Sequence, residues 1–230
     1  MLCDLPLSCR CGHTRGVARE VPPPAGFRLV CYCKDCQAFA HFLAHVPEKW
    51  TPVFRNGHAP MQEPDVLDPS GGTDIFQMPP GRLTFSAGED ALRSLRLSER
   101  TKVLRWYTEC CRTPIANTAG GARFPVIGLI HSFMGHDLTK DLTKDLAANG
   151  YSRDGILGPL RCRIHERSAT APLPPNAPPP ASFGFLARRA GTALGWWARG
   201  LARPNPFFDE RTKAPRAEPR VLTPSERAVL

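Results

Sequence analysis

The sequence contains no long apolar run. No stretch of about 18 uninterrupted apolar residues is present, and a membrane-spanning helix needs a stretch of that length. Residues 1–16, MLCDLPLSCRCGHTRG, also lack the apolar core of a secretory signal peptide. We therefore expect a cytoplasmic protein, in which cysteines stay reduced and act more often as metal ligands or redox groups than as disulfides.

Two common catalytic patterns are missing as well. The phosphate-binding pattern GxxxxGK[ST] does not occur, so the glycines in DPSGGTD at residues 68–74 predict a hairpin turn instead. Asp65 and Asp68 lie three residues apart but have no partner acid that the sequence places beside them. This argues against chemistry that depends on a pair of carboxylates.

Basic residues outnumber acidic ones. The formal net charge is +9, and residues 169–230 hold nine Lys/Arg against four Asp/Glu. A basic chain attracts anionic small molecules or nucleic acid, and charge alone does not distinguish these partners. In the first part of the chain a solvated surface of mixed charge explains the scattered Arg and Lys residues. We do not expect a nucleic acid as the partner.

Short segments rich in strand-forming residues, separated by turn residues, predict a mainly β fold. The predicted strands are FRLVCYC at 27–33, VFRN at 53–56, TDIFQM at 73–78, RLTFSAG at 82–88 and KVLRWYTE at 102–109. Residues 38–46 fit a short helix or a buried strand, and residues 124–133 fit a buried strand or a helix. Residues 136–150, with a leucine every four residues, predict an amphipathic helix that ends at a glycine.

The composition changes after Ser168. Residues 169–182 contain six prolines in fourteen positions, which predicts an extended polyproline linker. We therefore place one domain at residues 1–168, and a basic amphipathic helix with its tail at residues 183–230. The helix either folds back on its own domain or binds a membrane surface or a protein groove. The tail is expected to be poorly ordered or draped over the body.

Seven of the nine cysteines fall in three tight groups. These are CRCG at 9–12, CYCKDC at 31–36 and ECCR at 109–112. The CxC and CxxC spacings let one loop supply two or three of the four thiolates that zinc prefers. Seven ligands divide into one closed four-thiolate site, which would be structural, and one three-thiolate site with a position for water or a substrate thiol. In the alternative, Cys3 is an eighth ligand. Each site would then have four thiolates, and neither would keep a position for a substrate.

These groups carry a resemblance to a known family. CRCG, CYCKDCQ and the segment from Ser86 to Asn117 resemble the glutathione-dependent formaldehyde-activating enzyme family, whose relatives include centromere protein V. The resemblance spans residues 7–135 and implies a zinc-binding β-tent fold. It also implies that the CxCG and CxxC pairs hold a structural zinc, while the CxCxxC triplet holds a zinc that handles glutathione and its formaldehyde adduct. Cys9 and Cys11 then belong to the structural site, and the active site is formed by Cys31, Cys33 and Cys36.

The chain departs from the family pattern at its last cysteine pair. The family has an aromatic residue followed by CxxCGT, whereas this chain has WYTECCRTP. Thr108 therefore takes the place of the first cysteine, Cys111 that of the second and Arg112 that of the glycine. Adjacent strand residues point to opposite faces, so Cys110 and Cys111 can share one ion only where the backbone turns. The missing glycine makes such a turn harder.

We prefer a structural site with altered geometry, formed by Cys9, Cys11, Cys110 and Cys111. A three-cysteine site with Cys110 free, a metal-free buried pair and a vicinal disulfide are the alternatives. Several side chains near the ligand loops in sequence could assist chemistry, although each is more typical of a surface residue or of a residue that supports the ligands. They are His13, His41, His45, Lys34, Arg105 and Arg112.

Three classes of function follow. Three thiolates give a zinc site a net charge of −1, which suits exchange with a substrate thiolate better than activation of water. The resemblance implies a carbon–sulfur lyase that forms or splits an S-hydroxymethyl adduct of glutathione and formaldehyde. The alternatives are a non-catalytic zinc-stabilised module whose basic tail binds a protein or membrane, and a nucleic-acid module. The expected cofactor is zinc, with glutathione as a co-substrate.

Overall fold

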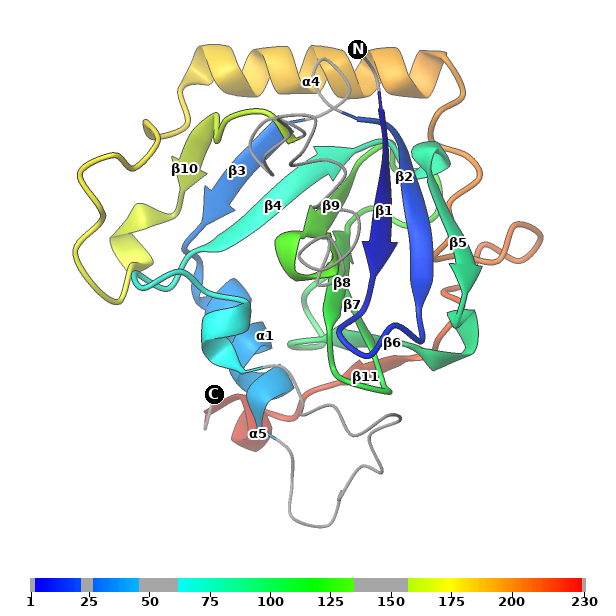
Figure 1. Ribbon diagram of the computed structural model, residues 1–230, viewed down its shortest axis with the longest axis horizontal. Helices are drawn as coiled ribbons and strands as arrows, with labels where there is room; N and C mark the ends of the chain where they lie inside the picture. Colours follow the sequence, from blue (N-terminus) through cyan, green and yellow to red (C-terminus); the bar gives the residue numbers. More distant parts are fainter. Residues whose placement is uncertain (1–2, 22–26, 46–61, 135–156, 229–230) are drawn as a thin grey trace, which may run out of the picture.

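The computed structural model describes residues 3–21, 27–45, 62–134 and 157–228, and in these ranges it is mainly β, as predicted (Figure 1). Two sheets and the helix α1 form the body, and the longer helix α4 lies along one side. The strand predicted at residues 53–56 and the helix predicted at residues 136–150 lie outside the described residues.

The smaller sheet has three antiparallel strands in the order β1-β2-β5. These strands are β1 (Cys3–Ser8), β2 (Arg15–Val21) and β5 (Leu83–Ala87). The larger sheet has eight strands in the order β10-β3-β4-β9-β8-β7-β6-β11. They are β3 (Phe27–Cys31), β4 (Thr73–Met78), β6 (Leu92–Arg96), β7 (Leu104–Thr108), β8 (Pro114–Thr118), β9 (Ile127–Ile130), β10 (Cys162–Ile164) and β11 (Pro219–Val221).

The six central strands of the larger sheet pair antiparallel, whereas each outer strand pairs parallel with its neighbour. β10 pairs with β3, and β11 pairs with β6. Both outer strands come from the last third of the chain. Residues far apart in the sequence therefore complete the two edges of this sheet.

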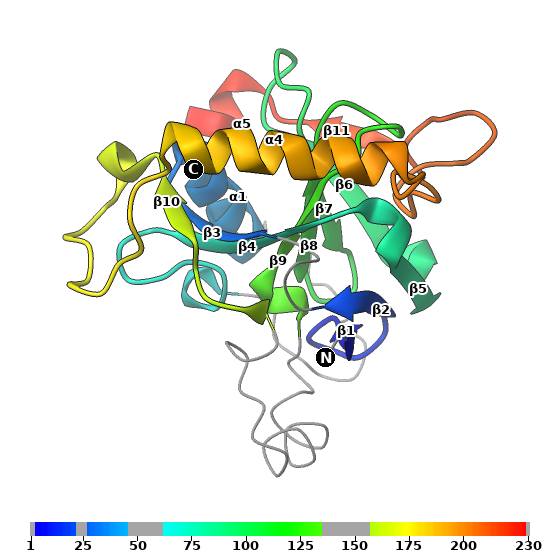
Figure 2. The same ribbon diagram turned by 90° about the horizontal axis from the view of Figure 1, so that it is seen from above.

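The main core lies between the two sheets. Side chains in strands alternate between faces, so Phe76, Trp106 and Leu129 of the larger sheet point toward Leu7 and Phe85 of the smaller one. All five side chains are buried in one hydrophobic cluster. The opposite face of the larger sheet is covered by helices, and Figure 2 shows this sheet between α1 and α4 on one side and the small sheet on the other.

Helix α1 (Lys34–Ala44) packs on that second face. The rings of Phe39 and Phe42 meet Tyr107 of β7 edge to face, with centroids 6.4 and 5.6 Å apart. Residues 38–44 are thus helical rather than a strand, and the helix begins within the second cysteine group, directly after Cys33. Residues 124–133 contain a buried strand, β9.

Helix α4 (Phe183–Ala198) begins at a Ser182 cap, whose hydroxyl accepts a hydrogen bond from the Phe185 amide at 3.1 Å. It lies along the edge formed by the start of β3 and the end of β4. The ring of Phe185 meets that of Phe27 at 5.6 Å, and Arg189 donates a hydrogen bond to Gln77. One side of the predicted amphipathic helix therefore does fold back on its own domain.

The proline-rich linker follows the surface of the body. Its backbone is held at Thr170, which donates to the Ser70 carbonyl at 2.9 Å, and at Pro172, whose carbonyl accepts from the Ser70 hydroxyl at 2.9 Å. The carbonyl of Pro179 accepts from the Arg163 amide at 2.8 Å. The domain boundaries at residues 168 and 182 stay a prediction. These hydrogen bonds join the linker to the body.

The tail is draped over the body and is not poorly ordered in its described part, residues 199–228. Phe207 is fully buried, with its ring 4.9 Å from that of Trp106 and 5.7 Å from that of Phe85. Beyond it the tail supplies β11 and a short helix, α5 (Pro224–Ala228). The segment lacks a periodic pattern because it buries single aromatic residues instead of one face of a regular element.

Within the described ranges, no helix is both long enough and apolar enough to cross a membrane.

The aromatic contacts of Phe207 predict that the tail stabilises the whole fold. We expect Phe207→Ala to lower the free energy of unfolding by about 3–5 kcal/mol, because it opens a cavity beside Trp106. Urea unfolding followed by circular dichroism measures this change. Phe183→Ala is the matched control, because the Phe183 side chain is 86% exposed. Equal stability of the two variants would show that the tail does not contribute to the core.

Candidate metal centres

Four cysteines from two distant turns form the first group, here called cluster 1. Cys9 and Cys11 lie in the turn from β1 to β2, and Cys110 and Cys111 lie in the turn between β7 and β8. Their sulfur atoms all lie within 4.8 Å of one another, and three of the four residues are buried. Cluster 1 thereby joins the small sheet to the large one.

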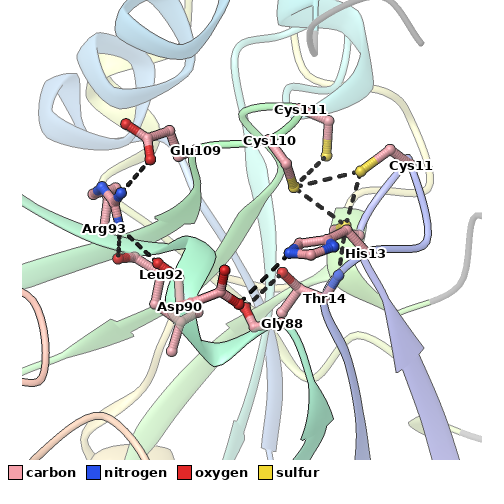
Figure 3. Close-up of polar contacts among 11 residues, drawn as sticks. Cys11, His13, Thr14, Gly88, Asp90, Leu92, Arg93, Glu109, Cys110 and Cys111 are labelled. Carbon is pink, nitrogen blue, oxygen red and sulfur yellow. Dashed lines mark hydrogen bonds and ion pairs between the residues drawn. The ribbon is translucent and has the colours of Figure 1, made fainter. Parts of the chain in front are cut away.

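The sulfur positions in cluster 1 fit a tetrahedral metal site (Figure 3). The Sγ atom of Cys110 lies 3.4 Å from that of Cys11, 3.9 Å from that of Cys9 and 3.8 Å from that of Cys111. The sulfur atoms of Cys9 and Cys11 are 3.6 Å apart. Four thiolates placed tetrahedrally at about 2.3 Å from a zinc ion have sulfur atoms roughly 3.8 Å apart. The donor set and its spacing therefore suit a zinc ion.

The same distances decide between two alternatives for the adjacent cysteines. A disulfide requires a sulfur–sulfur distance of about 2.05 Å, so Cys110 and Cys111, at 3.8 Å, are not bonded to each other. The vicinal-disulfide alternative is wrong in this structure. Cys110 also lies close to all three other sulfur atoms, instead of standing apart from them as a free thiol.

Hydrogen-bond donors surround the sulfur atoms of cluster 1. The backbone amide of Thr14 donates to Cys9 Sγ at 3.3 Å, and the hydroxyl oxygens of Thr108 and Thr113 lie 3.3 and 3.1 Å from Cys111 Sγ. Such donors stabilise thiolates and fix the orientation of metal ligands. At Thr108, where the resemblance leads us to expect a cysteine, the side chain supplies a hydroxyl that contacts Cys111 Sγ.

The loop that carries Cys9 and Cys11 is held from one side by the turn at Gly88. The Thr14 hydroxyl donates to the Gly88 carbonyl at 3.1 Å, and a Cβ atom at Gly88 would meet the His13 carbonyl oxygen at 2.5 Å. Only a glycine permits this approach. The His13 ring pairs with Asp90, at 3.6 Å, and does not join the sulfur atoms (Figure 3).

Arg112, at the position where the resemblance leads us to expect glycine, adopts a left-handed backbone conformation. Its φ is +57°, in the left-handed region that side chains disfavour. The guanidinium is buried, with Nε donating to the Leu43 carbonyl at 2.7 Å and a terminal nitrogen donating to the Phe42 carbonyl. It also lies 4.7 Å from the centroid of the Phe42 ring. These contacts compensate the backbone strain, so the missing glycine does not prevent the turn, and Arg112 is not available to a substrate.

Three cysteines at the start of α1 form the second group, here called cluster 2. Cys31 ends β3, Cys33 lies directly before α1, and Cys36 lies in its first turn. Their sulfur atoms lie within 4.8 Å of one another, and Cys33 is half-buried while the other two are buried. The Cys33 carbonyl accepts from the Cys36 amide at 2.9 Å. A helix N-terminus stabilises negative charge and therefore favours thiolates at this place.

Arg105 of β7 brings a positive charge to cluster 2. Its Nη1 atom lies 3.8 Å from Cys36 Sγ, and its side chain is buried over the Phe39 ring, 5.5 Å from the centroid. Asp35 lies 4.0 Å from the other terminal nitrogen and also pairs with Arg227 of α5. The pairing of Asp35 with Arg227 could not be predicted from the sequence, because Arg227 follows the cysteine group by almost two hundred residues.

The thiols of cluster 2 do not share negative charge equally. Hydrogen bonds from the thiols of Cys31 and Cys36 lower the pKa of Cys33 to about 2, and the charge of Arg105 contributes in the same direction. Hydrogen bonds to Cys33 and Cys36 raise the pKa of Cys31. The group therefore favours one thiolate next to thiols that keep their protons.

Cluster 1 shows the same inequality. Hydrogen bonds from Cys110 and Cys9 lower the pKa of Cys111, and hydrogen bonds to Cys111 and Cys9 raise the pKa of Cys110. Further thiolates at such short distances require a cation. A divalent metal ion supplies this charge and releases the remaining thiol protons when it binds.

Cys3 and Cys162 lie outside the two groups of clustered cysteines in the sequence. Cys3 begins β1, and six residues of extended strand separate it from Cys9 by about 20 Å. The Cys3 side chain is not among those described, so the eighth-ligand alternative stays open. Cys162 of β10 is buried near cluster 2, but its sulfur atom is outside the ligand group. Burial raises the pKa of Cys162.

The other predicted side chains do not enter the clusters. His41 pairs with Glu63 at 2.7 Å, and Lys34 and His45 are exposed near the two ends of α1. Of the candidates named from sequence, Arg105 is thus the one that reaches a cluster directly, and Arg112 acts by attaching cluster 1 to α1.

Comparison with known proteins gives a match to a protein family. A model of a protein family, described as a family of unknown function (DUF6151), matches residues 55–218. The matched region includes Arg105, the Cys110–Cys111 turn and α4. No curated protein matches the chain.

Replacing Cys110 tests whether cluster 1 uses four sulfur ligands. We expect Cys110→Ser to weaken metal binding at cluster 1 at least about tenfold, because the lost sulfur lies close to all the others. Metal per chain, by mass spectrometry, and competition with a chromophoric chelator measure the change. Cys162→Ser is the control, since this thiol is buried outside both clusters. Unchanged affinity in Cys110→Ser would favour the three-cysteine alternative, and metal-free wild-type protein would favour the buried pair.

Two substitutions at Arg112 separate its backbone role from its side-chain role. Both Arg112→Gly and Arg112→Ala lose the hydrogen bonds to α1 and should destabilise the fold. Glycine relieves the left-handed strain that alanine retains, so we expect Arg112→Gly to be more stable than Arg112→Ala by about 1 kcal/mol. Urea unfolding of the two variants measures the difference. If alanine proves equal to glycine, the backbone at this position is not strained.

Proposed function

This chain belongs to a family of unknown function, DUF6151, and from its own side chains we propose that it is a two-zinc protein whose second zinc handles a thiol adduct. Cluster 1 would hold a structural zinc, and cluster 2 a zinc that takes part in carbon–sulfur bond chemistry. The observation that carries this proposal is the difference between the clusters. Four sulfurs meet in cluster 1, and three meet beside a buried arginine in cluster 2.

A structural role for cluster 1 follows from its place in the fold. Its ligands come from both sheets, and its sulfur atoms are packed within the hydrophobic cluster between them. Four thiolates complete the coordination of a zinc ion and leave no position for a substrate. Loss of the metal would therefore separate the β1–β2 turn from the β7–β8 turn, which predicts an effect on stability.

Cluster 2 has the composition of an open site. In the described part of the chain, no His, Cys, Asp or Glu completes the group of Cys31, Cys33 and Cys36. A zinc ion bound by these three thiolates would lower the pKa of an added thiol and hold its sulfur. Arg105 compensates the excess negative charge of such a site, since three thiolates and one divalent ion sum to −1. The half-buried Cys33 marks the side from which a ligand would enter.

The reaction class that fits is the addition of a thiol to an aldehyde, or its reversal. The sulfur–carbon bond forms while the thiol proton passes to the carbonyl oxygen, and neither reactant is oxidised or reduced. Glutathione and formaldehyde are the substrates that the family resemblance implies. The basic surroundings of cluster 2 favour a thiol that carries carboxylates, as glutathione does.

A non-catalytic zinc-stabilised binding module is the second candidate. The observation in its favour is the outer side of α4, which exposes large apolar side chains to solvent. On this proposal both zinc ions would be structural, and glutathione would not change the coordination at cluster 2.

Zinc coordination measured with and without glutathione separates the two candidates. We expect two zinc ions per chain in protein purified without chelator, and X-ray absorption at the zinc edge should show one additional sulfur ligand, per chain, when glutathione is added. Arg105→Gln should weaken glutathione binding about tenfold or more, whereas Arg105→Lys should retain part of it because the charge remains. Coordination that does not respond to glutathione would reject the thiol site and favour the binding module.

A further inference from the structure

One buried hydroxyl has no hydrogen-bond partner within the described part of the chain. It belongs to Thr73, the first residue of β4, which is 2% exposed. The other unpartnered buried side-chain atoms in these ranges are the Nε atoms of Arg82, Arg96 and Arg163, and each of these arginines uses a terminal nitrogen for another contact. Leaving a buried hydroxyl unpaired costs free energy, so the position of Thr73 requires an explanation.

Thr73 lies opposite the first cysteine of cluster 2. In the antiparallel pair of β3 and β4, its direct partner is Cys31. Directly opposed residues share a face of the sheet, with Cβ atoms about 4.5–5.5 Å apart. Ile75, two residues further along β4, is on the same face and packs in one hydrophobic cluster with Cys31 and Cys36. The Thr73 side chain is therefore on the face of the sheet that carries cluster 2, and not on the face toward the small sheet.

Cluster 1 shows how this chain uses threonine hydroxyls beside its sulfur atoms. The hydroxyl oxygens of Thr108 and Thr113 lie 3.3 and 3.1 Å from Cys111 Sγ. A thiol is a weak hydrogen-bond acceptor, whereas a thiolate is a strong one. Metal binding converts cysteine ligands to thiolates. A metal ion at cluster 2 would therefore turn Cys31 into the strong acceptor that the Thr73 hydroxyl lacks.

The hydroxyl lies on the buried side of cluster 2. Cys31, its cross-strand partner, is 4% exposed, whereas Cys33 is half-buried and marks the side from which a ligand would enter. The partner that suits Thr73 is thus a sulfur atom of the protein rather than a group of the substrate.

We propose that Thr73 is a positioning residue of cluster 2, whose hydroxyl donates a hydrogen bond to the Cys31 thiolate when a metal ion is bound. This inference rests on the part of the proposed function that assigns a metal ion to cluster 2. Such a donor fixes the orientation of a ligand and changes how much charge the ligand gives to the ion. With part of the Cys31 charge held by the hydroxyl, a bound divalent ion would accept a further thiolate more readily.

Cadmium-113 NMR of the full chain tests the proposal, because cadmium also binds thiolates and its signal responds to each ligand. We expect two signals from the wild type, and Cys31→Ser identifies that of cluster 2. Thr73→Val keeps the shape of the side chain but removes the hydroxyl. It should shift the cluster 2 signal and weaken cadmium binding there about tenfold, without moving the cluster 1 signal. Thr73→Ser keeps the hydroxyl and should restore the signal and most of the affinity.

Thr118→Val is the matched control. Thr118 is also a buried threonine of the larger sheet, and its hydroxyl accepts from the Trp106 indole at 2.9 Å. This variant should be less stable than the wild type, but both cadmium signals should stay in place. If Thr73→Val does not fold, Thr73→Ala makes the same test, because it removes the hydroxyl without adding a methyl group.

The outcomes separate this inference from the proposed function. Two wild-type signals, with the cluster 2 signal unchanged in Thr73→Val, would overturn the role of Thr73 and leave the metal site intact. The partner of the hydroxyl would then be water. A wild type that binds no cadmium at cluster 2 would overturn both the role of Thr73 and the two-zinc proposal.

Discussion

The turn between β7 and β8 is the point on which the other parts of the structure depend. Its two cysteines meet those of the β1–β2 turn, so it fixes the small sheet against the large one. The next residue, Arg112, reaches in the opposite direction and binds the last carbonyls of α1. Cys110, Cys111 and Arg112 thus connect the small sheet, the large sheet and α1. The backbone at Arg112 is left-handed, and the contacts of its guanidinium stabilise this conformation.

Helix α1 has complementary charge at both ends. Its N-terminus carries Cys33 and Cys36, where the partial positive charge of the helix favours thiolates. Its C-terminal carbonyls accept hydrogen bonds from Arg112, where the partial negative charge favours a cation. Arg105, also from β7, adds positive charge near the first end. One strand and the turn after it therefore place a cation near each end of α1.

The sequence allowed the fold class, four of the described strands and the division of the cysteines into groups of four and three to be predicted. These features depend on local spacing and alternation, which one sequence displays. The contribution of Phe207 to the core and of β11 to the sheet could not be predicted, because both are contacts between segments about a hundred residues apart. The role of Arg112 was also missed. Its position in place of glycine was a signal of strain, but nothing local showed that helix carbonyls would offset it.

The strand order has a consequence for how the chain assembles during synthesis. All seven clustered cysteines are translated before the tail, so metal can join the two sheets while the ribosome is still adding later residues. Phe207 and β11 are translated about a hundred residues after Trp106 and β6, and until then Trp106 and the β6 edge lack these partners. The nascent protein would thus pass through a stage in which its cysteine clusters are assembled and its core is open. In that interval the unpaired β6 edge and the uncovered indole are the parts that a chaperone would have to protect.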